Sequence, residues 1–195
     1  MNAHLIERYI SEARFGKYKN LDEYEENLFF SKNSYIPLSV LEVALRNAID
    51  NLLTQKVGEQ WHEDNSFLTK DSQFKVQQAK EMLQKRREST SREKIIAELS
   101  FGFWVNLFKK PYDKKLRIKD LKKVFPNLPS KQEKLMNREV IYRELNHIRN
   151  FRNRVFHYEK VINKNNYNTV FSEIEEILNY FDTELNTFAQ RLNDE

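Results

Sequence analysis

The stretch Arg149-Asn150-Phe151-Arg152-Asn153-Arg154-Val155-Phe156-His157-Tyr158-Glu159-Lys160-Val161 decides how the C-terminal part of this chain is interpreted. It continues a long predicted helix whose apolar stripe is formed by Leu135, Val140, Ile141, Leu145 and Ile148. If the helix persists, Arg149, Asn153 and His157 form one polar stripe, because side chains four positions apart are neighbours. Arg152 flanks this stripe, about 100° from Asn153. A second face, available for burial, carries Phe151, Val155 and Tyr158.

The residue types in this stretch suit cleavage of RNA. Histidine has an unperturbed pKa of about 6.5, so it takes and returns a proton near neutral pH. With His157 accepting the proton of a ribose 2′-OH and Arg152 stabilising the attacked phosphate, the product would be a 2′,3′-cyclic phosphate, and no metal or cofactor is needed. The structural alternative is a hydrogen-bonding histidine on a salt-bridged arginine face, which residue types alone favour.

The composition favours an all-α protein. Only 3 Gly and 4 Pro occur among 195 residues, as is typical of long helices rather than of a turn-rich β architecture. The absence of cysteine excludes disulfides, Cys-ligated zinc and a thiol nucleophile. No apolar run approaches ~18 residues and the N-terminus shows no signal-peptide core, so we expect a soluble, cytoplasmic protein without a membrane segment.

Charge is concentrated locally rather than spread over the chain. The net charge of +4 is mild, but the segment from Lys109 to Lys123 contains eight Lys or Arg and only two Asp. This segment predicts contacts with an RNA backbone, and the alternative is an ordinary solvated loop and helix face. The RNA-binding candidates are Lys109, Lys110, Lys114, Lys115 and Arg117.

We expect one all-α domain over residues 1–195, with an N-terminal helical extension (1–35) and a core (36–195). Apolar spacing and breaker residues predict helices over residues 3–14, 21–30 and 36–57, with a polar break at residues 31–34.

In the third of these helices Glu42 and Arg46 are four apart and predict an intrahelical ion pair. The functional alternative is that Arg46 or Asn47 faces the same groove as His157.

The second half of the chain shows two potential capping boxes, Thr90 with Glu93 and Ser130 with Glu133. The first predicts a helix through Leu107, in which Gly102 lies among aromatic residues and indicates close helix packing. We expect these aromatic side chains to be core rather than a base-stacking platform. The second predicts the start of the long helix that ends in the opening stretch. A last helix over residues 171–192 completes the pattern.

Three segments together resemble the Abi-like (phage abortive infection, AbiD/AbiF-type) proteins of the HEPN superfamily. They are 41–47 (Leu-Glu-Val-Ala-Leu-Arg-Asn), 98–104 with the downstream 125–127 (Glu-Leu-Ser-Phe-Gly-Phe-Trp and Phe-Pro-Asn), and 149–157. The HEPN signature is Arg followed after four to six residues by His, often beginning Arg-Asn, and Arg152-Asn153 with His157 fits it. Where the family commonly reads His-His-Glu-Pro, this chain has His157-Tyr158-Glu159-Lys160.

This resemblance implies a HEPN-like helical bundle and an endoribonuclease of a phage-defence or toxin system, in which a homodimer brings two motifs into one cleft. It implies catalytic Arg152 and His157 with Asn153 in support, and a neutralising antitoxin or other defence partner. Glu159 would orient His157 or pair with an arginine. Further supporting candidates are Arg149, Arg46 and Asn47.

Two other functions remain open at this point. A non-catalytic HEPN module could hold RNA or a protein through the basic segment and the groove. A metal-dependent hydrolase could use His147, His157 and Glu159, although these lack a recognised ligand spacing.

Overall fold

A computed structural model describes residues 3–194, with side chains from His4 to Asn193. Within this range the regular elements are helices and no strand occurs, so the predicted all-α class is confirmed. The domain predicted over 1–195 includes residues 1–2 and 195, which lie outside the described residues. The elements are α1 (Ala3–Tyr9), α2 (Glu12–Phe15), α3 (Leu21–Lys56), η1 (Trp61–Glu63), α4 (Lys70–Lys85), α5 (Arg92–Glu98), α6 (Phe101–Asn106), η2 (Lys110–Tyr112), α7 (Ile118–Val124), α8 (Arg138–Phe156), η3 (Asn165–Tyr167), α9 (Val170–Phe181) and α10 (Thr183–Asp194).

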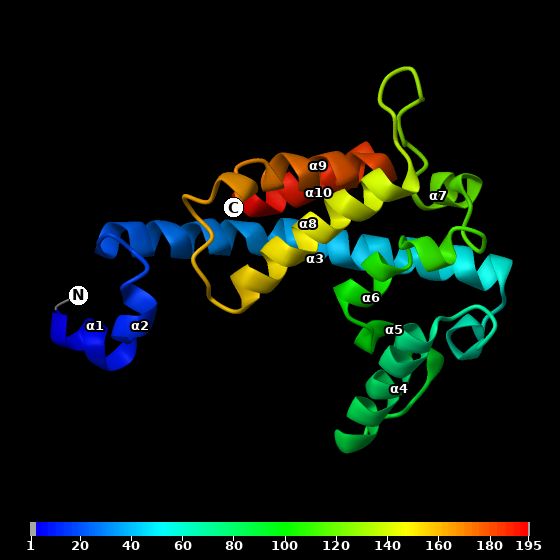
Figure 1. Ribbon diagram of the computed structural model, residues 1–195, viewed down its shortest axis with the longest axis horizontal. Coiled ribbons are helices and arrows are strands. Elements are labelled where there is room, and N and C mark those ends of the chain that lie inside the picture. The colour runs from blue at the N-terminus through cyan, green and yellow to red at the C-terminus, as the bar shows by residue number, and fades with distance from the viewer. Residues whose placement is uncertain (1–2, 195) are drawn as a thin grey trace.

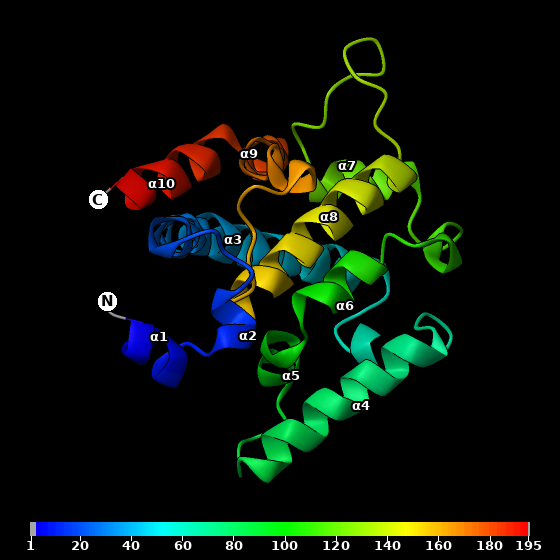
Figure 2. The ribbon, with the colours of Figure 1, turned by 60° about the vertical axis from the view of Figure 1, so that its left-hand side comes forward.

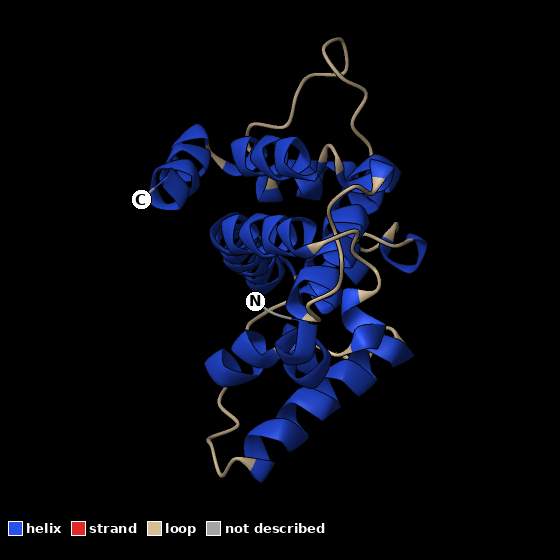
Figure 3. Cartoon of the chain, turned by 90° about the vertical axis from the view of Figure 1, so that its left-hand side faces the viewer, coloured by secondary structure: helices blue, strands red, loops and turns tan. Residues whose placement is uncertain are grey.

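The helix α3 is the axis of the molecule (Figure 1). Helices α8, α9 and α10 pack along it, and α6 packs against α8 on the other side. Figure 3 shows that loops are confined to the connections and to one long excursion between α7 and α8. The C-terminal part of α8 is thereby placed between α3 and the α4–α6 region.

The length of α3 differs from the sequence-based prediction. Residues 21–56 form one helix of 36 residues, so the predicted break at residues 31–34 is wrong and the boundary predicted after residue 35 falls inside it. The hydroxyl of Ser34 is buried and donates to the Phe30 carbonyl over 2.7 Å, which satisfies a polar group that otherwise favours a turn. Pro37 is accommodated inside the helix despite its missing N–H. The helices that pack against α3 stabilise it enough to outweigh these local signals.

The core lies where α3, α8 and α9 meet. Leu135, predicted as part of the stripe of the long helix, instead lies in the loop before α8 and is 61 % exposed, so that part of the prediction is wrong. Ile141, Leu145 and Ile148 of the same stripe are buried as predicted. Each such side chain contributes about 1.5–3 kcal/mol when it leaves water. Residues here with at most 2 % exposure include Leu41, Leu45, Ile49, Ile141, Leu145, Ile148, Phe151, Ile174 and Leu178.

The helix predicted from residue 90 to Leu107 is split into α5 and α6. Leu99 adopts an extended backbone and the Ser100 hydroxyl caps α6 by accepting from the Phe103 N–H. The predicted Thr90 and Glu93 capping box is wrong, because α5 begins after Ser91, which makes no side-chain cap. The aromatic residues of this region are core as predicted, with Trp104 fully buried and its indole N–H donating to the Leu99 carbonyl over 3.2 Å.

The helix α8 starts later than predicted. Its N-cap is Asn137, which accepts from the Val140 N–H over 3.0 Å. The Ser130 N–H does bond Glu133 over 2.8 Å, but only in a turn of the loop before α8, so that predicted capping box is also wrong. This loop projects from the helices (Figure 2).

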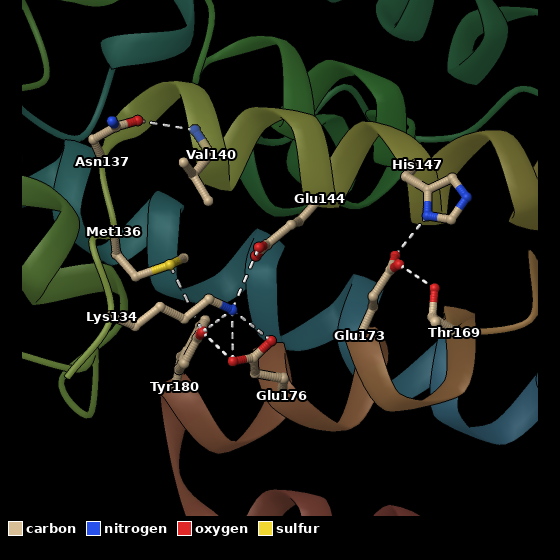
Figure 4. A network of polar contacts seen from close by, with 10 residues as sticks. All are labelled: Lys134, Met136, Asn137, Val140, Glu144, His147, Thr169, Glu173, Glu176 and Tyr180. Carbon is tan, nitrogen blue, oxygen red and sulfur yellow. Dashed lines mark hydrogen bonds and ion pairs between the residues drawn. The ribbon is translucent and has the colours of Figure 1, made fainter. Parts of the chain in front are cut away.

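Lys134 anchors the projecting loop to α9. Its ammonium lies 2.7 Å from the Glu176 carboxylate and 3.2 Å from the Tyr180 hydroxyl (Figure 4). Burial lowers the pKa of Lys134, but the bonds to Glu176 and Tyr180 outweigh it and the pKa is raised. The ammonium therefore stays charged and holds the loop.

The last predicted helix is divided at Asp182 into α9 and α10, which pack against each other and against α3. Across residues 3–194, no helix is both long and apolar enough to cross a bilayer.

Candidate functional site

A cleft of about 230 Å³ lies between the C-terminal half of α8, the start of α6 and the start of α4. Three of the predicted site residues, Arg149, Arg152 and Asn153, line it. The remaining walls come from two other helices, and none of them was predicted from the sequence as a site residue. These walls are Asp71, Ser72, Lys75, Ser100, Phe101, Gly102, Phe103 and Asn106.

Arg149 lies directly over Gly102. A Cβ at position 102 would be 3.4 Å from the Arg149 Cδ and 3.7 Å from its Nη1. The close packing predicted for Gly102 is therefore confirmed. The side chain that packs against it is that of Arg149, not an apolar one. The Nε of Arg149 is buried and has no hydrogen-bond partner among the described residues.

Arg152 is held from two sides. Its Nη2 lies 3.3 Å from the Glu42 carboxylate, and its guanidinium carbon lies 4.4 Å from the centre of the Phe156 ring. The predicted Glu42 and Arg46 pair is thus wrong, because Glu42 faces α8 instead. The Nε of Arg152 is buried without a partner in the described part of the chain, so it retains a donor for a ligand.

Arg46 and Asn47 are not brought into the cleft. The Arg46 Nε donates to the side-chain oxygen of Asn47 over 3.2 Å, and this contact is exposed. Neither residue lines the cleft beside Arg149. Among the described residues no contact joins Arg46 or Asn47 to His157, so the alternative that they share a groove has no support here.

His157 occupies the C-cap of α8, outside the cleft. Its side chain is exposed, and no described residue bonds to the imidazole. Five positions on a helix correspond to a rotation of about 140°, so His157 and Arg152 leave α8 on different sides. Within one chain the two predicted catalytic groups are close in sequence but do not converge.

Glu159 pairs with Arg154 over 2.6 Å rather than with His157. Both side chains are more than 40 % exposed, so we expect this pair to contribute less than about 1 kcal/mol. Of the two predicted roles for Glu159, the structure shows the pairing with an arginine.

The backbone after His157 is held by the N-terminal part of α3, which sequence reasoning missed. Asn27 is 2 % exposed. Its side-chain oxygen accepts from the N–H groups of Val161 and Ile162 over 2.7 and 3.3 Å, and its amide donates to the Glu159 carbonyl over 3.4 Å. Nothing in the spacing around residue 27 indicates this contact, which joins positions 132 or more residues apart.

Glu23 adds a charged contact to the same loop. Its carboxylate lies 2.8 Å from the Lys160 ammonium and accepts from the Asn163 amide over 2.8 Å. The hydrogen bond from Lys160, with those from Lys19 and Asn163, lowers the pKa of Glu23 to about 2. Arg14 donates to the Tyr158 carbonyl, so the predicted N-terminal extension is attached to the segment that follows the motif.

The five RNA-binding candidates of the basic segment lie in three environments. Lys109, Lys110 and Arg117 line a larger cavity of about 730 Å³ at the other end of α8. The Lys115 ammonium is already engaged, since it donates to the carbonyls of Ser66 and Phe67 over 2.8 and 2.7 Å. Lys114 is exposed and lines neither this cavity nor the cleft beside Arg149.

The metal-ligand set considered from the sequence is not assembled. Among residues 3–194, no three His, Asp or Glu side chains gather closely enough to hold a metal ion. His147 instead bonds Glu173 over 2.6 Å (Figure 4). It also bonds the Asn166 carbonyl, and the centre of its ring lies 5.5 Å from that of the stacked Tyr167 ring. This histidine ties α8 to α9 and η3.

Comparison with protein-family models, with curated proteins and with solved structures gave no match to this chain. The likeness to Abi-like proteins therefore depends on the three sequence segments alone.

Proposed function

We propose that this protein is a metal-independent endoribonuclease with a HEPN-like bundle, of the kind its Abi-like motifs suggest. The observation that carries the proposal is the environment of the two motif residues. The exposed imidazole of His157 has no side-chain partner among the described residues. It follows the helix whose last turns line a cleft with Arg149, Arg152 and Asn153. Where two copies of the chain face each other, a phosphodiester would meet the proton-transfer group of one copy and the phosphate-binding groups of the other.

The reaction uses only groups of the protein and the RNA. The His157 imidazole takes the proton of a ribose 2′-OH, the 2′-oxygen bonds to the adjacent phosphorus, and the bond from phosphorus to the 5′-oxygen breaks. Arg152 stabilises the charge on the phosphoryl oxygens. The leaving 5′-oxygen takes a proton from a second imidazole, so the products are a 2′,3′-cyclic phosphate and a 5′-hydroxyl.

The need for a second imidazole supports a site shared by two copies of the chain. Arg152 and His157 diverge by about 140° on α8, so a facing copy would bring the missing group to each. The surface around His157 is suitably apolar, with Tyr35, Phe156 and Tyr158 exposed by 58 %, 40 % and 73 %. Aromatic side chains are enriched in the cores of protein interfaces.

The biological setting follows from the resemblance. We propose action on cytoplasmic RNA in phage defence or as a toxin, with a neutralising antitoxin or another defence-system partner. Such a partner would have to cover His157 or prevent two copies from meeting.

One observation favours a second candidate function, a non-catalytic RNA-binding module. Arg152 is already occupied by Glu42 and Phe156, and His157 lies outside the cleft. If these contacts persist on binding, the cleft would retain RNA without cutting it.

Cleavage of RNA in EDTA separates the two functions. We expect wild-type protein to produce ends with 2′,3′-cyclic phosphates, and His157→Ala to be slower by about 10² to 10⁴. His4→Ala is the matched control, because His4 is an exposed histidine of α1, far from the motif in sequence. Salt-sensitive retention of RNA with no cleavage by the wild type would favour the binding module. Equal cleavage by wild type and His157→Ala would remove His157 from the mechanism.

A mixing experiment tests the shared site. When wild-type protein is held constant and His157→Ala is added in excess, mixed dimers form and wild-type activity should fall. An excess of His4→Ala should leave the activity at least as high as before. Unchanged wild-type activity with excess His157→Ala would show that each chain acts alone.

A further inference from the structure

The cavity of about 730 Å³ at the N-terminal end of α8 has the size of a small-ligand site. Its walls come from η2, from α7 and from the first turns of α8. Four cationic side chains line it against two carboxylates, Asp113 and Glu139. The four are Lys109, Lys110, Arg117 and Arg138.

Arg138 is the most enclosed of these cations, with 13 % of its side chain exposed. Its Nε lies 2.9 Å from the Asp113 carboxylate and its Nη1 donates to the Leu107 carbonyl over 3.1 Å. Its Nη2 is buried and has no acceptor among the described residues. Burial lowers the pKa of Arg138, yet an arginine remains protonated in proteins, so a buried donor is left for an anionic oxygen.

The start of α8 adds to this attraction. Its helix of 19 residues directs the positive end of its dipole toward the cavity wall formed by Asn137, Arg138 and Glu139. Only the Val140 N–H of the first turn is capped by Asn137. Phosphate groups bind readily where a guanidinium and a helix N-terminus coincide.

The cavity also has an aromatic and an apolar wall. Tyr142 lines it from α8, and the Lys109 ammonium lies 5.8 Å from the centre of the Tyr142 ring. Ile118, the first residue of α7, is half exposed and lines the cavity too. A planar base can stack on such a ring, as in sequence-tolerant binding of single strands. A phosphate donor set and a stacking ring together fit a nucleotide.

A polar track joins this cavity to His157 along α8. At about 100° per residue, Arg143, Asn146, Asn150, Asn153 and His157 fall within about 80° of one another. Each is exposed or half-buried, and no carboxylate lies in this sector after Glu139. Glu144 is on another side of the helix, 3.6 Å from Lys134. Donors without a repelling charge suit a phosphate backbone.

We propose that the cavity holds one nucleotide of a single-stranded RNA, and that the strand follows the exposed track of α8 toward His157. The role of the track in bringing RNA to His157 rests on the proposed function, but RNA binding can be measured without cleavage. The cavity would then anchor the strand about 28 Å from His157, because about 19 residues of helical rise separate Arg138 from His157.

The test measures RNA affinity in the His157→Ala background, by fluorescence anisotropy of a labelled oligouridylate. Tyr142→Ala should weaken binding about fivefold or more through lost stacking. Lys109→Gln should weaken binding and lower the slope of log affinity against log salt by about one. Lys114→Gln is the matched control in the same basic segment outside the cavity. Arg143→Glu should weaken binding if the strand follows the track.

Three outcomes would overturn the inference. These are unchanged affinity in Tyr142→Ala, equal effects of Lys109→Gln and Lys114→Gln, or saturable binding of uridine monophosphate that leaves RNA affinity independent of Tyr142. Thermal melting of each variant ensures that a loss of binding is not a loss of folding. If wild type and His157→Ala cleave equally while the cavity variants still weaken RNA binding, the nuclease proposal fails and the nucleotide site stands.

Discussion

The two ends of α8 handle their charges in opposite ways. At the N-terminal end Arg138 is bonded to Asp113 and to the Leu107 carbonyl, and Lys134 is bonded across to α9. At the C-terminal end Asn27 bonds to the backbone that follows His157, and the His157 side chain stays exposed. The first arrangement fixes side chains, and the second fixes the main chain and leaves the side chain available. The unpaired His157 side chain is free to meet a substrate or a second copy of the chain, whereas most donors of the paired side chains at the other end are already engaged.

Two arginines of α8 allow the sharpest test of this comparison. Arg152→Ala should lower the cleavage rate by about 10² to 10³, with a loss of stability below about 1 kcal/mol because its pair with Glu42 is partly exposed. Arg138→Ala should lower stability by about 1–3 kcal/mol, since it leaves the Leu107 carbonyl unpaired. Urea unfolding and EDTA cleavage assays of both variants check this. If Arg152→Ala unfolds readily and cleaves normally, the contrast between the two ends is wrong.

Among the variants without a loss of cleavage, removing the backbone clamp should have the largest effect on stability. Asn27→Ala leaves the buried N–H groups of Val161 and Ile162 without their acceptor, so we expect a loss of about 2–4 kcal/mol in the free energy of unfolding. Asn33→Ala, an exposed position on the same helix, should cost less than about 0.5 kcal/mol. Urea titration of the two variants measures the difference, and equal midpoints would show that the clamp contributes nothing.

The charged contact beside the clamp gives a pH dependence. Because the pKa of Glu23 is lowered to about 2, its contribution to stability is present above its unfolded pKa of about 4.3 and is lost as pH falls toward 2. The melting temperature of the wild type should therefore fall more steeply than that of Glu23→Gln between those pH values. Parallel curves for the two proteins would mean that Glu23 is not held by Lys160 in solution.

The smallest effect is expected at Glu159. Glu159→Gln weakens only an exposed pair with Arg154, so stability should change by less than about 0.5 kcal/mol. Cleavage activity and its pH profile should stay close to those of the wild type. A shift of the profile toward lower pH would instead show that Glu159 raises the pKa of His157 and has the orienting role considered from the sequence.

Local sequence signals predicted the apolar faces well and the helix boundaries less well. Ile141, Leu145 and Ile148 are buried as predicted, because apolar residues that recur with a period of about 3.6 form one face of a helix. The polar break at residues 31–34 failed because the Ser34 hydroxyl bonds to the Phe30 carbonyl within the helix. The two capping boxes failed because α5 and α8 begin at later residues, after Ser91 and Asn137. Leu99, in contrast, ends α5 although its own propensity favours helix.

The candidate site was predicted only in its helical part. Arg149, Arg152 and Asn153 were identified because they share one motif on one helix. Gly102, Lys75 and Asn106 come from other elements, and Asn27 acts over more than 130 positions, so no spacing in the sequence connects them to the motif. Glu42 was assigned to its neighbour Arg46, whereas the crossing of α3 and α8 gives it to Arg152.

The sequence by itself determined that this chain is helical, that its core lies along two amphipathic stripes, and that one helix ends in a concentration of arginine, asparagine and histidine. These are properties of residue type and periodicity, which act over a few positions. Only the tertiary structure decided which polar groups are paired and which remain available. Pairing depends on how α3, α6 and α8 cross, and the crossing is set by the packing of many side chains far apart in the chain.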